Sequence, residues 1–129
     1  MEIGTGSGYQ TAVLAQLVGE VYSVEHIKPL QQKARQRLRQ LRLRNVLFDH
    51  ADGCMGWPEY GPYDGIVVTA APQRIPEELL SQLAVGGRMV VPVGGDTQHL
   101  QIVTRSAAGI ETEVVEAVYF VPLRPGKER

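Results

Sequence analysis

Three glycines at alternate positions, Gly4, Gly6 and Gly8, separate a short apolar stretch from an amphipathic segment that starts near Thr11. Glycine lets the backbone adopt positive φ angles and approach a ligand closely, and the free N–H groups of a following helix would face that ligand. The pattern therefore predicts a nucleotide-binding turn between a strand and a helix. Only Met1–Ile3 of the strand that should precede such a turn is present.

The overall composition limits the classes to which the chain can belong. It has 129 residues, a formal net charge of −1 and one cysteine, Cys54. The length suits a single domain, residues 1–129. One cysteine can form neither an internal disulfide nor a zinc cluster, which indicates a reducing compartment, here the cytoplasm. No stretch approaches the roughly 18 apolar residues of a membrane span. We therefore expect a monomer with no nucleic-acid and no membrane partner.

Strand and helix periodicities alternate along the chain. Strands are expected at 21–24, 46–48, 65–69 and 88–93, and helices at 11–18, 28–43 and 76–83. The last of these helices is expected to end at Gly86–Gly87. Beyond residue 93 the pattern changes to strands at 100–104 and 114–121, joined by a turn at 107–109, which predicts an antiparallel hairpin. The fold class is therefore α/β, a mostly parallel sheet with a C-terminal antiparallel hairpin and a truncated first strand.

The glycine spacing separates two classes of nucleotide-binding α/β proteins. Dinucleotide-binding turns follow the pattern G-x-G-x-x-G, but the sixth position here is Tyr9. The spacing therefore argues against a nicotinamide or flavin dinucleotide. A tight turn with a purely structural role is the alternative interpretation.

Two acidic residues follow predicted strands on the side where a ligand would bind. Glu25 ends the second strand, 21 residues after Gly4, and a carboxylate there can accept hydrogen bonds from both ribose hydroxyls. Asp52 follows the third strand and could accept from an adenine amino group, while Gly53 lets the backbone pass under the ring. An ordinary Asp-Gly turn is the alternative for this pair.

More particular patterns occur in seven segments spread over the chain. They are Glu2–Ala12, Val24–His26, Asp52–Gly53, Tyr63–Ile66, Thr69–Pro72, Leu83–Arg88 and Val118–Leu123. Together these segments resemble the protein-L-isoaspartate O-methyltransferases. The sequences Gly-Ser-Gly-Tyr-Gln-Thr, Thr-Ala-Ala-Pro and Phe-Val-Pro-Leu are the most specific part of the resemblance.

The resemblance implies a Rossmann-like, S-adenosylmethionine-dependent methyltransferase sheet. It also implies transfer of a methyl group from S-adenosylmethionine to the carboxylate of L-isoaspartyl residues in damaged proteins and peptides, a protein-repair reaction. Methylation of another carboxylate or of a small metabolite is an alternative. A non-catalytic cofactor-binding domain is a second alternative, from a different class.

By position, the resemblance assigns two sets of residues to the site. The cofactor-binding set is Glu2, Gly4, Thr5, Gly6, Ser7, Gly8, Glu25, His26, Asp52, Gly53 and Thr69. The substrate-binding set is Ala70, Ala71, Pro72, Val121, Pro122 and Leu123. No residue is assigned as catalytic, because a carboxylate with a reference pKa of about 4 is already ionised at neutral pH and needs no general base. His26, His50 and His99 lack the spacing of a metal site, so no metal is expected.

The chain departs from the family pattern at its beginning. Members of the family carry further chain before the glycine turn, including a Ser-Gln-Pro segment whose serine contacts the substrate carboxylate. That segment is absent here. We therefore expect a truncated chain that is prone to aggregation and inactive alone.

Basic residues are concentrated in one helical segment. Seven of the thirteen in the chain are Lys28, Lys33, Arg35, Arg37, Arg39, Arg42 and Arg44. Apolar residues of the same segment recur at helical spacing and should pack inward. We therefore interpret the basic residues as a solvent-exposed helix face rather than as a nucleic-acid site.

Overall fold

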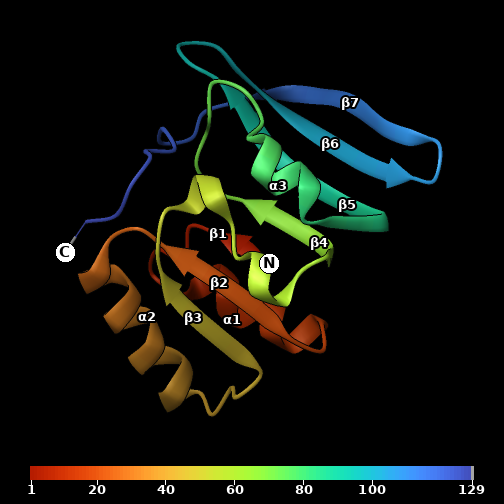
Figure 1. Ribbon diagram of the computed structural model, residues 1–129. Coiled ribbons are helices and arrows are strands. Elements are labelled where there is room, and N and C mark those ends of the chain that lie inside the picture. Colours follow the sequence, from red (N-terminus) through yellow and green to blue (C-terminus); the bar gives the residue numbers. More distant parts are fainter. Residues whose placement is uncertain (129) are drawn as a thin grey trace.

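The computed structural model describes residues 1–128, which contain one seven-stranded sheet (Figure 1). The strands lie side by side in the order β3-β2-β1-β4-β5-β6-β7. They are β1 (Glu2–Ile3), β2 (Val21–Glu25), β3 (Val46–His50), β4 (Tyr63–Val68), β5 (Leu83–Gly94), β6 (Gln98–Ser106) and β7 (Gly109–Val118). Strands β1 to β5 run parallel, whereas β6 and β7 are antiparallel to their neighbours. The predicted α/β class, with its C-terminal hairpin, is confirmed.

Three α-helices and two short 3-10 turns connect the strands. They are α1 (Tyr9–Leu17), α2 (Lys28–Gln40), η1 (Gly53–Met55), η2 (Pro58–Tyr60) and α3 (Glu77–Ser81). None of the helices in residues 1–128 is long and apolar enough to cross a bilayer.

The register between β1 and β2 shows how the two faces of the sheet are used. Glu2 and Ser23 are register partners, and the Glu2 side chain reaches Thr11 of α1. Ile3 and Val24 form the next pair and point to the opposite face, because side chains alternate along a strand. The central strand is therefore polar toward α1 and apolar on its other side.

The main apolar core lies on the face to which Ile3 and Val24 point. Leu79 of α3 packs into it and is fully buried. The other members come from β4, β5 and β6 and complete the core: Tyr63, Ile66, Val68, Leu83, Met89, Val91 and Val103. The run Ile66–Val68 behaves as its continuous apolar sequence predicts, as part of a strand between two others.

One predicted element boundary is wrong. The pair Gly86–Gly87 was expected to end a helix, but α3 already ends at Ser81 and both glycines lie within β5. Leu83 pairs with Tyr63 of β4, and the register shifts before Gly65 pairs with Arg88. Gly86, with φ of 85°, lies in this irregular part of the strand rather than in a helix cap. Strand pairing therefore begins five residues earlier than the apolar run at 88–93 suggests.

Other boundaries differ by a few residues. Helix α2 was expected to reach residue 43, but it ends at Gln40 and is followed by Arg42 with φ of 60°. The last strand was expected at 114–121 and occupies Gly109–Val118. The hairpin turn itself lies at residues 107–108, between β6 and β7, as predicted.

Gly8 joins the glycine turn to the helix layer. It is the N-cap of α1 with φ of 86°, and a Cβ placed on it would lie 3.0 Å from Ala34 Cβ and 3.2 Å from Leu38 Cδ2 of α2. Only glycine satisfies both constraints, because an L side chain is strained at this φ and has no space. Close contact between the end of the glycine turn and α2 therefore depends on this residue.

We predict that Gly8→Ala lowers the free energy of unfolding by about 3 kcal/mol, from backbone strain together with overpacking. Gly6→Ala is the matched control, because Gly6 also has a positive φ, 54°, but nothing lies within 4 Å of its Cβ position. We expect it to cost only about 1 kcal/mol. Urea unfolding of both variants measures the difference, and equal losses would show that the contact with α2 is unimportant.

Candidate functional site

A pocket opens at the carboxyl ends of the central parallel strands, where open α/β sheets bind ligands. It is lined by parts of the glycine turn, the end of β2, the segment after β4 and a C-terminal segment. Ten residues assigned to the site from sequence line it: Gly4, Gly6, Glu25, His26, Gly53, Thr69, Ala70, Val121, Pro122 and Leu123. The structure therefore brings together residues that are up to 119 positions apart, as Gly4 and Leu123 are.

The glycine turn adopts the backbone that its sequence predicts. Gly4, Gly6 and Gly8 all have positive φ angles, of 98°, 54° and 86°. The N–H of Gly4 donates to the carbonyl of Val24 at 2.8 Å, and the N–H of Gly8 donates to that of Thr5 at 3.0 Å. The turn is thus attached to β2 at one end and closed on itself at the other.

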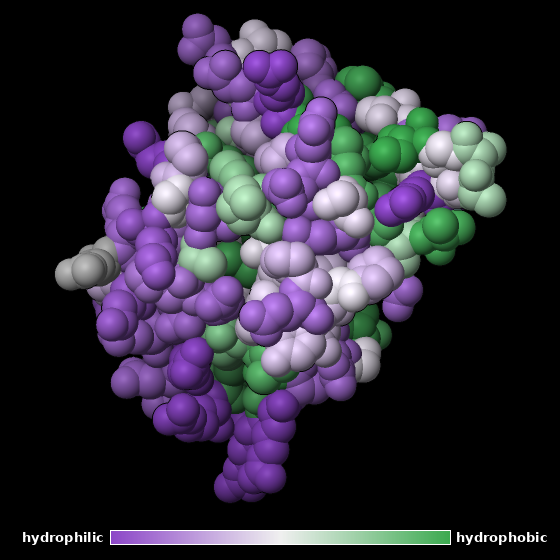
Figure 2. Space-filling model, in the orientation of Figure 1, coloured by the Kyte–Doolittle hydropathy of each residue, from purple (hydrophilic) through white to green (hydrophobic). Residues whose placement is uncertain are grey.

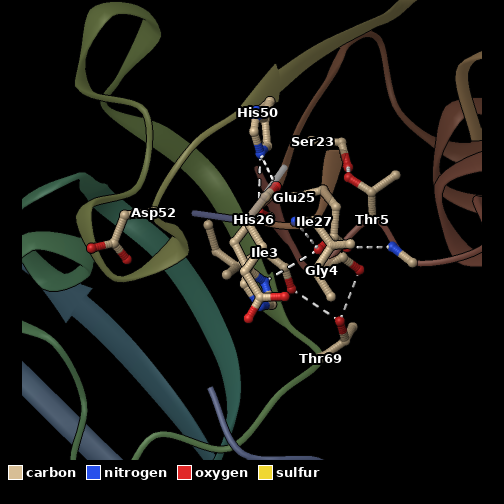
Figure 3. Close-up of polar contacts among 12 residues, drawn as sticks. Ile3, Gly4, Thr5, Ser23, Glu25, His26, Ile27, His50, Asp52 and Thr69 are labelled. Carbon is tan, nitrogen blue, oxygen red and sulfur yellow. Dashed lines mark hydrogen bonds and ion pairs between the residues drawn. The ribbon is translucent and has the colours of Figure 1, made fainter. Parts of the chain in front are cut away.

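Glu25 connects this turn to the beginning of α2 (Figure 3). The residue is 4% exposed, and Oε1 accepts the N–H of Gly6 at 2.8 Å. Oε2 accepts the N–H of Ile27 at 3.0 Å and lies 3.2 Å from Nδ1 of His26. A carboxylate has about four acceptor positions, so Glu25 retains capacity for ligand donors while it holds the turn.

Thr69 fixes the opposite wall of the pocket. Its hydroxyl lies 3.0 Å from the carbonyl oxygen of Ile3 and 2.9 Å from that of Gly4, to which it can donate (Figure 3). A Cβ on Gly4 would lie 2.3 Å from Thr69 Oγ1. The end of β4 and the start of the glycine turn therefore approach as closely as a glycine allows.

The two members of the Asp52–Gly53 pair lie differently. Gly53 is buried, lines the pocket and would place a Cβ 2.7 Å from Ile3 Cγ2. Asp52 is not among the lining residues, and its Oδ1 accepts the N–H of Cys54 at 2.9 Å as the cap of the following 3-10 turn. Figure 3 shows its carboxylate apart from the group around Glu25. The local turn and the pocket wall thus use adjacent residues.

The two segments of the predicted substrate set bond to each other. The N–H of Ala71 donates to the carbonyl of Val121 at 2.7 Å, and the N–H of Leu123 donates to that of Ala71 at 2.9 Å. Ala71 and Pro72 are buried behind the lining, whereas Val121 and Pro122 are exposed at the surface. The chain then continues to Glu128, whose carbonyl accepts the N–H of Lys28 at 2.9 Å.

Glu2 and Thr5, both assigned to the cofactor set, face away from the pocket into a buried polar network. Glu2 is fully buried, and its Oε1 accepts from the hydroxyls of Thr11 and Ser23, the latter at 2.6 Å. Ser23 Oγ also lies 2.6 Å from Thr5 Oγ1. Glu2 Oε2 has no hydrogen-bond partner among the described residues. Burial raises the pKa of Glu2, and the bonds from Ser23 and Thr11 lower it in part.

Sequence reasoning missed Ser23 and Thr11. The available signal was a serine within the apolar run Val21–Val24, a polar residue that a buried strand accepts only with a partner. Of the remaining assigned residues, Ser7 is exposed and its carbonyl accepts from Arg37 at 2.8 Å. No cluster of potential metal ligands occurs in residues 1–128.

Comparisons with known proteins agree with this architecture. The family model for protein-L-isoaspartate(D-aspartate) O-methyltransferase matches residues 1–128. The chain is 58% identical over 132 residues to a protein-L-isoaspartate O-methyltransferase of Cellvibrio japonicus, covering 100% of this chain and 59% of that protein. It is 60% identical to a second such protein, from Marinobacter nauticus, covering 98% of this chain and 58% of the relative. The chain thus spans less than two thirds of the length of these relatives.

Solved structures give the same result. A protein-L-isoaspartate O-methyltransferase superposes with a TM-score of 0.88 at 32% identity, over 94% of this chain and 40% of that one. A Plasmodium falciparum protein described as a putative member of the same family, in complex with S-adenosyl-L-homocysteine, superposes with a TM-score of 0.81 at 27% identity, over 95% of this chain and 64% of its own.

The raised pKa of Glu2 gives a prediction with a definite sign. Because the pKa of Glu2 is raised above its ordinary value of 4.5, this carboxyl keeps its proton to a higher pH in the folded state than in the unfolded state. Its contribution to stability is therefore present at low pH and is lost as the pH rises through the folded pKa. We predict that Glu2→Gln, which cannot ionise, gains stability relative to the unsubstituted protein as the pH is raised from 4.5 toward neutrality.

Unfolding free energies at a series of pH values test this. Glu113→Gln, the same substitution at an exposed position, is the control. A Glu2→Gln curve parallel to that of the unsubstituted protein would show that Glu2 ionises in the folded state as it does in the unfolded one.

Proposed function

The chain belongs to the protein-L-isoaspartate(D-aspartate) O-methyltransferase family, and from this premise we propose the reaction that the whole protein performs. It transfers a methyl group from S-adenosylmethionine to the carboxylate of L-isoaspartyl residues in damaged proteins and peptides. One observation supports this most directly. A single pocket combines the glycine turn and Glu25 with Thr69, Ala70 and the segment Val121–Leu123, so cofactor and substrate residues share one opening.

S-adenosylmethionine is the proposed cofactor, and the residues fit it. Glu25 has unused acceptor capacity beside the pocket and would accept from the ribose hydroxyls. Gly6 leaves open space where a side chain would be, so that the backbone of the turn, with Ser7, borders the ribose and the methionine portion. When bound, the cofactor supplies an electrophilic methyl group. The Plasmodium falciparum relative, whose structure contains S-adenosyl-L-homocysteine, supports this choice.

The remaining assignments are proposed with the roles that their positions allow. Gly53 would lie under the adenine, and Asp52 keeps its Oδ2 for the adenine amino group while Oδ1 caps the 3-10 turn. Glu2 and Thr5 would act on the cofactor indirectly, by holding the turn from behind. His26 would contact the ribose beside Glu25.

The protein's own residues would align the reactants rather than transfer protons. An isoaspartyl carboxylate has a reference pKa of about 4 and is ionised at neutral pH, so it needs no base. The half-buried apolar side chains of Ala70 and Leu123 would exclude water from part of the surroundings of this charge. Alignment for in-line attack in a dry pocket is then the main source of rate enhancement.

We also propose that the protein works as a monomer in the cytoplasm, without a nucleic-acid partner. The single cysteine, Cys54, and the near-neutral formal charge support this. The soluble polypeptides of that compartment, after ageing, would be its substrates.

The role of Glu25 in cofactor binding is testable. We predict that Glu25→Ala in the full-length protein weakens S-adenosylmethionine binding by about 1.5–3 kcal/mol, as expected for lost hydrogen bonds to a charged group. Glu25→Gln, which keeps the packing of the side chain, should weaken S-adenosylmethionine binding by less. The exposed Glu113→Ala is the control and should bind normally. Calorimetry with folded variants decides, and unchanged affinity in Glu25→Ala would remove this residue from the site.

The reaction itself is tested with two peptides that differ only in an L-isoaspartyl or a normal aspartyl residue. We predict that the full-length protein labels the isoaspartyl peptide with radioactive methyl groups and labels the aspartyl peptide about a hundredfold more slowly. The carboxylates of the two isomers differ in position by about an ångström, and a misplacement on that scale lowers the reaction rate by about a hundredfold. Equal labelling would contradict the proposed substrate, and labelling of neither would contradict the proposed reaction.

A further inference from the structure

One face of α2 carries a row of cations that the proposed reaction does not use. Lys28, Arg35 and Arg39 line a surface hollow together with Gln31, Gln32, Gln36 and His50. The helix members of this set are spaced by three and four residues, which places them on one side of the helix. We call the exposed residues of this set, Lys28, Gln32, Arg35, Gln36 and Arg39, the cationic stripe; Gln31 is buried.

No salt bridge joins the charges of the stripe to a carboxylate within residues 1–128. No aspartate or glutamate occurs in residues 26–48. The only ion pair within residues 1–128 joins His26 to Glu25. Lys28, Arg35 and Arg39 are all exposed, and the side of the molecule that carries α2 is densely hydrophilic in Figure 2. The face is therefore free to bind an anionic partner.

The stripe starts at the rim of the pocket. Helix α2 begins three residues after Glu25, and Ile27 and Leu30 of the same segment line the pocket. Thirteen helical residues extend for about 20 Å. A polypeptide with one residue in the pocket must leave it over the rim, and the stripe is one of the surfaces along which it can continue.

We propose that the cationic stripe docks acidic segments of the polypeptide substrate, an inference that rests on the function proposed above. The lysine and the arginines would attract carboxylates that flank the reactive residue. The glutamine amides can donate to and accept from an extended backbone. Beside them β3 is an edge strand of the sheet, with unpaired backbone groups on its outer side.

Composition favours a polypeptide over a single-stranded nucleic acid. Nucleic-acid grooves combine positive charge with aromatic side chains on which bases stack. The lining of the hollow contains no aromatic ring other than His50. The nearby ring of Phe48 has the guanidinium of Arg35 over it, 5.6 Å from the ring centroid. A platform for base stacking is thus missing from this face.

The experiment uses the full-length protein and two isoaspartyl peptides, one with acidic flanking residues and one with neutral residues. The variant Arg35→Gln/Arg39→Gln removes two charges from the stripe. The matched control Lys33→Gln/Arg88→Gln removes two exposed charges that do not line this hollow. Arg35→Lys/Arg39→Lys keeps the charge and should restore binding if charge is what matters. Initial rates give kcat and KM for each pair at low and at high salt.

We expect the stripe variant to lose about fivefold in kcat/KM for the acidic peptide at low salt, through KM, with kcat unchanged. The neutral peptide and the control variant should be unaffected, and high salt should abolish the difference. Equal losses for both peptides, no loss, or failure of the lysine variant to restore the rate would overturn the proposal. Inhibition by a single-stranded oligonucleotide that the stripe variant escapes, without a peptide effect, would also overturn it. If the unsubstituted protein labels neither peptide, the proposed reaction has failed instead.

Discussion

The pairing of β1 with both of its neighbours is the interaction on which the sheet and the pocket depend. Two residues, Glu2 and Ile3, pair with β2 on one side and with β4 on the other. Their side chains point to opposite faces, so one strand anchors α1 through Glu2 and the apolar core through Ile3. The carbonyl oxygens of Ile3 and Gly4 then face Thr69. The start of the glycine turn is therefore held by β2, by β4 and by the hydroxyl of Thr69.

Two buried acids serve this arrangement in different ways. Both oxygens of Glu25 face backbone N–H groups of segments that border the pocket, Gly6 and Ile27. Glu2 lies behind the turn, bonded through one oxygen to hydroxyl groups and with the other oxygen unpaired among the described residues. A carboxylate open to a ligand can exchange or add donors, whereas one sealed under a helix can only hold its neighbours in place. The first acid is suited to binding and the second to support.

The sequence predicted the parts of this structure that depend on local patterns. Alternate glycines before an amphipathic helix and an acid at the end of β2 are visible in single segments, and the ring of elements around the pocket follows from the α/β topology. The network of Glu2, Ser23 and Thr11 was not predictable in this way, because it joins three elements through the register of β1 on β2. Gly86 was misassigned because a glycine pair ends helices and also permits irregular strands, and only the pairing of Leu83 with Tyr63 decides between them. The Asp52 carboxylate bonds locally to Cys54, a contact that short acidic side chains often prefer.

The two sides of helix α2 have different roles: one packs against the glycine turn and the other is exposed and positively charged. Its inner side carries Ala34 and Leu38, which lie against Gly8 and so help to place the glycine turn. Its outer side places like charges four residues apart, as at Arg35 and Arg39, which destabilises a helix by about 0.2–0.5 kcal/mol per pair. The helix dipole offsets part of this cost only for Arg37 and Arg39 in the last turn. Folding alone would favour mixed charges on this face, because alternating signs stabilise an exposed helix. A concentration of one sign beside the pocket is therefore better explained by a partner of the opposite sign than by the stability of the helix.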